Sequence, residues 1–228
     1  MSNEEQPKRK PRLSCLELII TIVIIGVLVA TVPPAIKRAH EHSWVKFDCA
    51  KNMHQLYLAL HTYHDAYQSL PPAFTVDAEG RPLHSWRVLV LPYLEAEKLY
   101  QNIRLDESWD SEYNQQFHDQ MPSVFACPAT ALKKGETTYM ALTGPETCFP
   151  GAGCRAWDDP ALDRETSVLL VEAAIGTCWM APVDVSVEAM PHVSNHHSGG
   201  GHIIMADGAV IYVKADEVLS AKREMQNN

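Results

Sequence analysis

The first quarter of the chain opens with a polar leader and then a long apolar run. Residues 13–32 are apolar or small, with Glu17 as the one charged exception. A helix needs about 20 apolar residues to cross the roughly 30 Å hydrocarbon core of a bilayer. The run therefore predicts a membrane-spanning helix that begins near Leu13 and ends near Val32.

After Pro33-Pro34 the apolar positions become periodic. They recur every three or four residues, which places them on one face of an α-helix: Val45, Cys49, Met53, Leu56, Leu60, Tyr63 and Tyr67. Because proline disfavours helical backbone before it, Pro71-Pro72 predicts that this helix ends near Ser69. Together the two segments predict one long N-terminal helix, apolar in its first half and amphipathic in its second.

The remainder of the chain mixes short helical and strand patterns. Residues 86–100 indicate one or two short helices, and residues 123–128, 137–142 and 167–172 read as strands. Asp207-Gly208 separates two β-rich runs and predicts a C-terminal hairpin, since glycine tolerates the positive φ of a tight turn. We expect an α+β fold in which the long helix, membrane-spanning in its first half, packs on an antiparallel β-sheet head.

The distribution of charge predicts how the helix is oriented across the membrane. The whole chain has a net charge of −9, whereas Lys8, Arg9, Lys10 and Arg12 crowd the start. Basic residues beside a membrane helix favour the cytoplasmic side. We therefore expect a cytoplasmic leader over 1–12, the transmembrane half over 13–34 and a periplasmic head over 35–228. A cleaved signal peptide fits less well, because its apolar core is usually about 7–15 residues long.

The acidic head limits the classes of partner. Binding of a nucleic acid needs clustered Lys and Arg to neutralise phosphates, and residues 35–228 contain no such tract, so we expect no nucleic-acid partner. No nucleophile-elbow, P-loop or dinucleotide motif occurs, so the sequence offers no case for catalysis and no catalytic residue. The sequence favours a structural or binding protein over an enzyme.

Six cysteines are present, and none forms a Cys-x-x-Cys pair, so a zinc ribbon has no support. Disulfides form in oxidising compartments outside the cytoplasm. In a periplasmic head we expect a disulfide between Cys148 and Cys154, which are separated by a short Gly/Pro-rich loop.

A histidine-rich stretch near the C-terminus leaves two interpretations open. His192, His196, His197 and His202 precede Asp207 and could bind a borderline metal such as zinc. The alternative is a glycine-rich turn in which His197 hydrogen-bonds to loop backbone and Asp207 supports the hairpin. The turn is the main interpretation, and we expect neither a metal nor another cofactor.

The start of the apolar run resembles the type IV prepilin N-terminus. A short basic leader precedes Leu13, two small residues, Leu16 and Glu17, and an unbroken apolar helix follows. The resemblance implies cleavage between Arg12 and Leu13, methylation of Leu13, and pairing of Glu17 with a neighbouring subunit's amino terminus. Arg12 stands where that family has glycine, and a long side chain obstructs close backbone approach. An uncleaved single-pass anchor therefore stays open beside the processed form.

A second resemblance covers most of the chain. His197, nine further residues and Asp207-Gly208 form a His-x9-Asp-Gly pattern that resembles the C-terminal signature of a large bacterial family of unassigned function. Members of that family also carry a prepilin-type N-terminus. Further blocks resemble the family over residues 60–67, 85–87, 91–95, 105–111, 125–128 and 179–184. The resemblance implies a pilin-like fold and a pseudopilin-like protein of the cell envelope.

These observations predict a single-pass protein of the bacterial inner membrane with a structural or interaction role. Its expected partners are membrane lipid, other pilin-like subunits of a type II secretion or type IV pilus-like assembly, and a prepilin peptidase. The alternative is a membrane-tethered binding module whose histidine-rich loop holds a metal or a small ligand.

Overall fold

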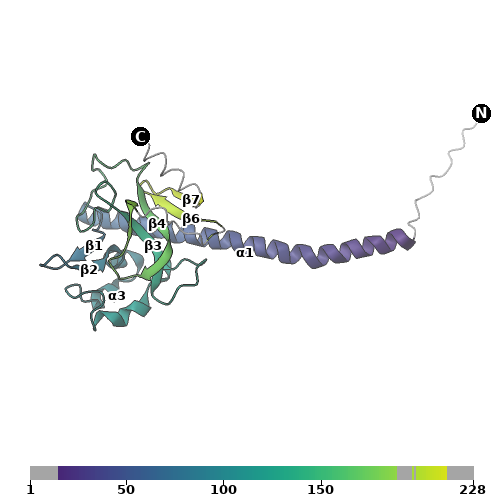
Figure 1. Cartoon of the computed structure of the whole chain (residues 1–228), viewed down its shortest axis with the longest axis horizontal. Helices are drawn as coiled ribbons and strands as arrows, with labels where there is room; N and C mark the ends of the chain where they lie inside the picture. The colour runs from purple at the N-terminus through teal and green to yellow at the C-terminus, as the bar shows by residue number, and fades with distance from the viewer. Residues whose placement is uncertain (1–14, 189–196, 198, 215–228) are drawn as a thin grey trace, which may run out of the picture. The chain divides into compact units, whose positions relative to one another are not determined.

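The computed structural model describes residues 15–188, 197 and 199–214, without the side chains of residues 15, 17 and 33–43 (Figure 1). The chain divides into two compact units, Met1–Trp44 and Val45–Asn228. Arg12 and Leu13, between which cleavage is predicted, lie outside the described residues, as does the side chain of Glu17.

One helix, α1 (Cys15–Tyr67), contributes to both units. It ends at Tyr67, because the next residue, Gln68, has a φ of 57°, and this end is close to the one that Pro71-Pro72 predicts. Within the second unit, Cys49, Met53, Leu56 and Leu60 have no exposed surface. The predicted amphipathic stripe is therefore confirmed over these four positions.

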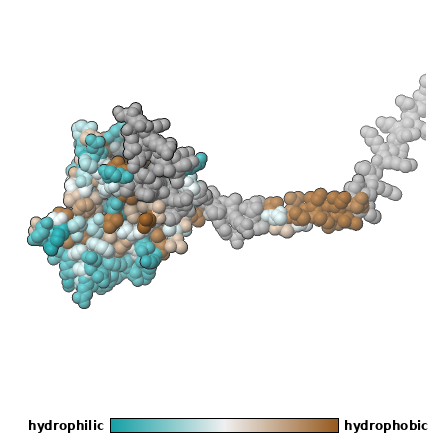
Figure 2. Space-filling view, viewed as in Figure 1, coloured by the Kyte–Doolittle hydropathy of each residue, from teal (hydrophilic) through white to brown (hydrophobic). Residues whose placement is uncertain are grey.

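The predicted membrane-spanning half of this helix is wrong. Among the helices formed by described residues, none is long and apolar enough to cross a membrane. The side chains that the structure describes over residues 18–32 are almost all apolar. These side chains are exposed and form the brown segment in Figure 2.

The main sheet has five strands in the order β5-β3-β4-β6-β7. They are β3 (Glu136–Thr143), β4 (Val168–Cys178), β5 (Val185–Ser186), β6 (Gly200–Met205) and β7 (Val210–Lys214). The predicted C-terminal hairpin is β6–β7, with Asp207-Gly208 in its turn. The predicted antiparallel sheet forms over β3, β4, β6 and β7, but the whole sheet is mixed, because β5 pairs parallel to β3. A smaller antiparallel ribbon pairs β1 (Phe74–Val76) with β2 (Pro82–Ser85).

Short helices fill the segment between the two sheets. They are α2 (Trp86–Leu89), η1 (Leu91–Leu94), α3 (Glu97–Asn102), η2 (Asn114–Gln120) and η3 (Ser123–Phe125). The first three agree with the helices predicted over 86–100. The strand predicted over 123–128 is wrong, because η3 forms there instead. Pro122 and Pro128 flank this segment, and neither can donate a backbone hydrogen bond to a strand ladder.

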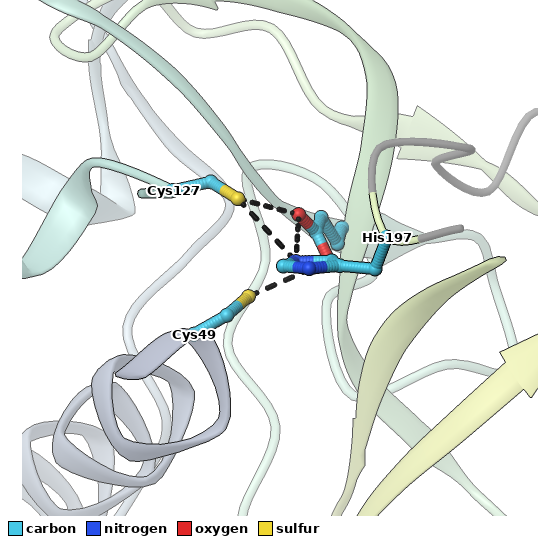
Figure 3. A group of neighbouring side chains, drawn as sticks. Cys49, Cys127 and His197 are labelled. Atoms are coloured by element: carbon cyan, nitrogen blue, oxygen red, sulfur yellow. Dashed lines mark hydrogen bonds and ion pairs between the residues drawn. The ribbon is translucent and has the colours of Figure 1, made fainter. Parts of the chain in front are cut away.

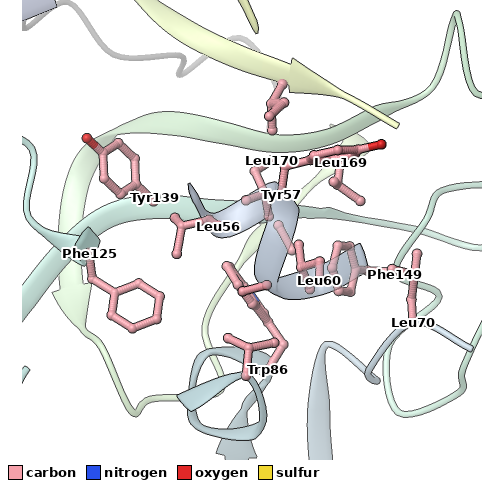
Figure 4. Packing of buried hydrophobic residues seen from close by; sticks show 14 of the residues in the cluster. Leu56, Tyr57, Leu60, Leu70, Trp86, Phe125, Tyr139, Phe149, Leu169 and Leu170 are labelled. Carbon is pink, nitrogen blue, oxygen red and sulfur yellow. The ribbon is translucent and has the colours of Figure 1, made fainter. Parts of the chain in front are cut away.

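The core of the second unit lies between the buried face of α1 and the sheet (Figure 4). Leu56 and Leu60 meet aromatic side chains from several segments, among them Trp86, Phe125 and Phe149. The ring of Trp86 lies edge-on to Phe125, with 6.2 Å between the centroids, a geometry that aromatic pairs prefer. The helix is thus held by packing against residues distant from it in the sequence.

A buried ion pair connects α2 to the segment before β5. The guanidinium of Arg87 donates to Asp184 Oδ1 over 2.7 Å, and the two side chains are 0% and 4% exposed. The same oxygen accepts from the indole of Trp86 and from the backbone N–H of Ala141. Burial lowers the pKa of Arg87 and raises the pKa of Asp184, and the attraction between the two charges opposes both shifts. Each of these two buried charges is therefore stabilised by the other.

We predict that Asp184→Asn lowers the free energy of unfolding by about 3–5 kcal/mol, because it leaves the Arg87 charge buried and uncompensated. Urea denaturation followed by tryptophan fluorescence measures the change. The matched control is Glu79→Gln, which removes the charge of an exposed pair with Arg81. Exposed ion pairs contribute little to the free energy of unfolding, so this variant should keep the denaturation midpoint of the parent. Equal midpoints for the two variants would contradict the assignment.

Candidate metal centre

Four buried polar side chains meet beneath α1. They are Cys49 on α1, Cys127 just after η3, Glu172 on β4 and His197 in the turn before β6. Figure 3 shows Cys49, Cys127 and His197 pointing toward one another. One ligand atom from each of the four residues lies within 4.8 Å of every other. Four segments that are far apart in the sequence thus place thiols, an imidazole and a carboxylate at one point.

The contacts within this cluster are short. Cys127 Sγ lies 2.8 Å from Glu172 Oε1 and 3.5 Å from His197 Nε2. His197 Nε2 lies 3.1 Å from Glu172 Oε1, and Cys49 Sγ lies 3.5 Å from Glu172 Oε2. None of the four residues is more than 3% exposed. Water therefore does not separate these groups, and they interact directly.

Neighbouring groups hold the cluster in place. The hydroxyl of Tyr139 donates to Cys49 Sγ over 3.1 Å, and the backbone N–H of His202 donates to Glu172 Oε2 over 3.1 Å. The hydroxyl of Tyr212 donates to the backbone carbonyl of His197. Each contact comes from a strand, namely β3, β6 or β7. The sheet thereby fixes the positions of the four side chains.

The cluster changes the acidity of its members. A hydrogen bond with Cys49 lowers the pKa of Cys127 to about 6 against the effect of burial, and the same bond raises the pKa of Cys49. Burial alone would raise the pKa of Glu172, but hydrogen bonds with His197, His202 and Cys127 lower it. Burial alone would lower the pKa of His197, but Cys127 and Glu172 raise it to about 9. The neighbours of Glu172 therefore favour its ionised form, and Glu172 in turn favours the protonated form of His197.

This donor set can do three things chemically. Two thiols, an imidazole and a carboxylate can coordinate a transition metal. The imidazolium and the carboxylate can form a buried ion pair, and the two thiols can be oxidised to a disulfide. With four buried protein side chains around one point, the arrangement is of the closed kind seen in structural metal sites. A catalytic metal site would keep one position open for water or substrate.

The structure brings together only part of the predicted histidine site. His197 lies in the cluster, and His202 Nδ1 lies 3.5 Å from Glu172 Oε2 at its edge. His192 and His196 lie outside the described residues. Cys49, Cys127 and Glu172 were missed, since Cys49 fits an apolar stripe and Cys127 has no nearby cysteine. The available signal is Glu172, a charged residue within an otherwise apolar strand sequence.

The disulfide expected between Cys148 and Cys154 is not formed. Both are free thiols, as are Cys49, Cys127 and Cys178. Cys148 belongs to the buried core, whereas Cys154 is exposed. The two side chains thus occupy different environments although their positions in the sequence are close.

Asp207 and Gly208 support the hairpin, as the turn interpretation predicts. Asp207 Oδ1 accepts from the backbone N–H of Ala209 over 2.8 Å. Gly208 has a φ of 95°, which favours glycine. A Cβ at this position would lie 2.9 Å from the ring of Tyr57, a residue of α1. Gly208 therefore serves both the turn and the close approach of the hairpin to the helix.

We predict that Gly208→Ala destabilises the protein more than Gly80→Ala, which is the matched control. Gly80 also has a positive φ, of 79°, but its added Cβ would meet nothing within 4 Å. Both variants incur the strain of a left-handed residue, roughly 1–2 kcal/mol. Only Gly208→Ala adds the clash with Tyr57, about 1–3 kcal/mol for overpacking. Chemical denaturation of both variants measures the difference, and equal losses would show that the Tyr57 contact is unimportant.

Comparison with known proteins gives one match. A family model described as a protein of unknown function (DUF1559) matches residues 46–174, which is more than half of the chain. The matched range includes Cys49, Cys127 and Glu172 and ends before His197. No curated protein and no solved structure matches the chain.

Proposed function

The chain belongs to this family of unknown function, and from that premise we propose that it is a membrane-associated structural and interaction protein of the pseudopilin kind. In this proposal the apolar part of α1 assembles with the helices of like subunits. The second unit, Val45–Asn228, is the part that such an assembly displays.

The exposed apolar surface of α1 carries the proposal (Figure 2). Its large apolar side chains between residues 16 and 32 are 42–68% exposed. They are Leu16, Leu18, Ile19, Ile20, Ile22, Val23, Ile24, Ile25, Val27, Leu28, Val29 and Val32. Since successive helical residues are about 100° apart, Ile22 to Ile25 alone cover every side of the helix. This segment has no polar face.

A helix that is apolar on all sides is normally buried, because water penalises each exposed side chain. One partner helix would cover a single stripe of this segment and leave its remaining faces exposed to water. Several surrounding helices, together with lipid, cover all of them. This is why we propose assembly among like subunits rather than docking to one partner.

Glu17 supports the same proposal through its position. It lies on α1 at the start of the apolar segment. In an apolar surrounding, an unpaired carboxylate costs several kcal/mol, so a positive group must accompany it. The resemblance to prepilins supplies a candidate, namely the amino terminus of a neighbouring subunit.

The proposal predicts that a photo-reactive amino acid at Ile24 cross-links to other protein chains in the native membrane. Mass spectrometry should identify the adducts as apolar helices of copies of this chain or of other pilin-like subunits. The control position is Glu79, which lies on the exposed turn between β1 and β2 and should give few adducts. Glu17→Gln keeps the shape of the side chain and removes its charge. This substitution should lower the yield of protein cross-linked at Ile24 about tenfold, because a loss of about 1.4 kcal/mol of association free energy corresponds to a factor of ten.

Two results would argue against this assembly. Adducts from Ile24 that contain only lipid would make α1 a tether rather than an assembly element. Protein adducts from Ile24 no more abundant than those from Glu79 would remove the special role of the apolar segment.

A further inference from the structure

We propose that Cys49, Cys127, Glu172 and His197 bind one structural zinc ion, which ties α1 to the sheet and to the turn before β6. This inference is independent of the proposed assembly, because all four residues belong to the second unit.

The spacing of the ligand atoms fits a tetrahedral ion. Zinc bonds of about 2.3 Å to sulfur and about 2.0 Å to nitrogen or oxygen place neighbouring ligand atoms about 3.2–3.8 Å apart. Two of the contacts between proposed ligand atoms, at 3.1 and 3.5 Å, lie at or close to that range. A third, 2.8 Å between Cys127 Sγ and Glu172 Oε1, needs to lengthen by about 0.7 Å, because a sulfur–oxygen pair on zinc lies about 3.5 Å apart. All four ligand atoms already lie within 4.8 Å of one another, so shifts of up to about 1 Å bring them to tetrahedral spacing.

The donor types select zinc among the common metals. Calcium and magnesium take oxygen ligands and would leave both sulfurs unused. Iron–sulfur clusters are usually held by four cysteines, and blue-copper sites by two histidines and one cysteine. Two cysteines with one histidine and one carboxylate instead fall within the ligand types that zinc binds with four-coordinate geometry. The two thiols of Cys49 and Cys127 therefore favour zinc over metals that prefer oxygen ligands.

The two oxygens of Glu172 have separate partners. Oε1 faces Cys127 and His197, the position that a metal ligand requires. Oε2 accepts from the backbone N–H of His202 and lies 3.5 Å from both His202 Nδ1 and Cys49 Sγ. Hydrogen bonds from outside the ligand set commonly orient the ligands of a metal. The hydroxyl of Tyr139 likewise orients a ligand, because it donates to Cys49 Sγ.

Burial makes the site structural rather than catalytic. The four ligands are 0–3% exposed, so neither water nor a substrate reaches the ion. An ion held there joins α1, the segment after η3, strand β4 and the turn before β6. Such a link acts like a covalent crosslink between segments that packing alone must otherwise hold together. Zinc should therefore stabilise the fold without supplying chemistry.

The test uses the full chain, stripped with a chelator, reduced, reloaded with excess zinc chloride and desalted. Elemental mass spectrometry should find about one zinc ion per chain, as expected for one four-ligand site. Cys127→Ala and Glu172→Gln should each reduce the retained zinc to a small fraction of that. Cys148→Ala is the matched control, because it removes a buried free thiol outside the cluster, and it should retain zinc at the parent level.

A second measurement keeps the proposal testable if the cluster variants fail to fold. The unmodified chain loaded with cobalt(II) should show thiolate-to-cobalt charge-transfer absorption and the intense visible bands of tetrahedral cobalt. Three results would overturn the proposal. They are a reduced chain that retains no zinc, retention that Cys127→Ala leaves unchanged, and bound cobalt without the thiolate band. A Cys49–Cys127 disulfide in the protein from cells would also overturn it.

Discussion

The second unit depends on how the carboxylate of Glu172 is accommodated. A charged side chain with no exposed surface is very costly unless it is paired. Cys127, His197 and His202 all contact its oxygens, and they come from two different parts of the chain. Cys49 adds a contact from α1. The requirement to satisfy one carboxylate thus brings the helix, the loop after η3 and the C-terminal turn to the same point.

Along α1, apolar packing holds the helix on the sheet, and polar contacts fix its position. Leu56 and Leu60 bury their side chains against aromatic residues of the core, which holds the helix on the sheet without fixing its exact position. Cys49, two or three turns earlier on the same face, meets directional partners in Glu172 and Tyr139. Gly208 lets the hairpin approach Tyr57 on that helix. The polar contacts of Cys49 and the close approach of the hairpin to Tyr57 therefore set the register of helix and sheet.

Much of the fold follows from local sequence signals. The step of three or four residues predicts the buried face of α1, Pro71-Pro72 predicts its end, and Asp207-Gly208 predicts the hairpin. The mixed character of the sheet escapes prediction because β5 is only Val185–Ser186, too short for a periodic pattern. The apolar run after Leu13 predicts a membrane-spanning helix, which the described part of α1 does not provide.

The cluster is hard to predict for a different reason. His197 is recognisable from its spacing to Asp207-Gly208, but that spacing describes a turn and says nothing of Cys49 or Cys127. Only the tertiary fold brings these residues together. The most direct measurement is X-ray absorption at the zinc edge on the metal-loaded full chain. Our account predicts about two sulfur neighbours near 2.3 Å and about two nitrogen or oxygen neighbours near 2.0 Å. A spectrum with nitrogen and oxygen neighbours alone would contradict it.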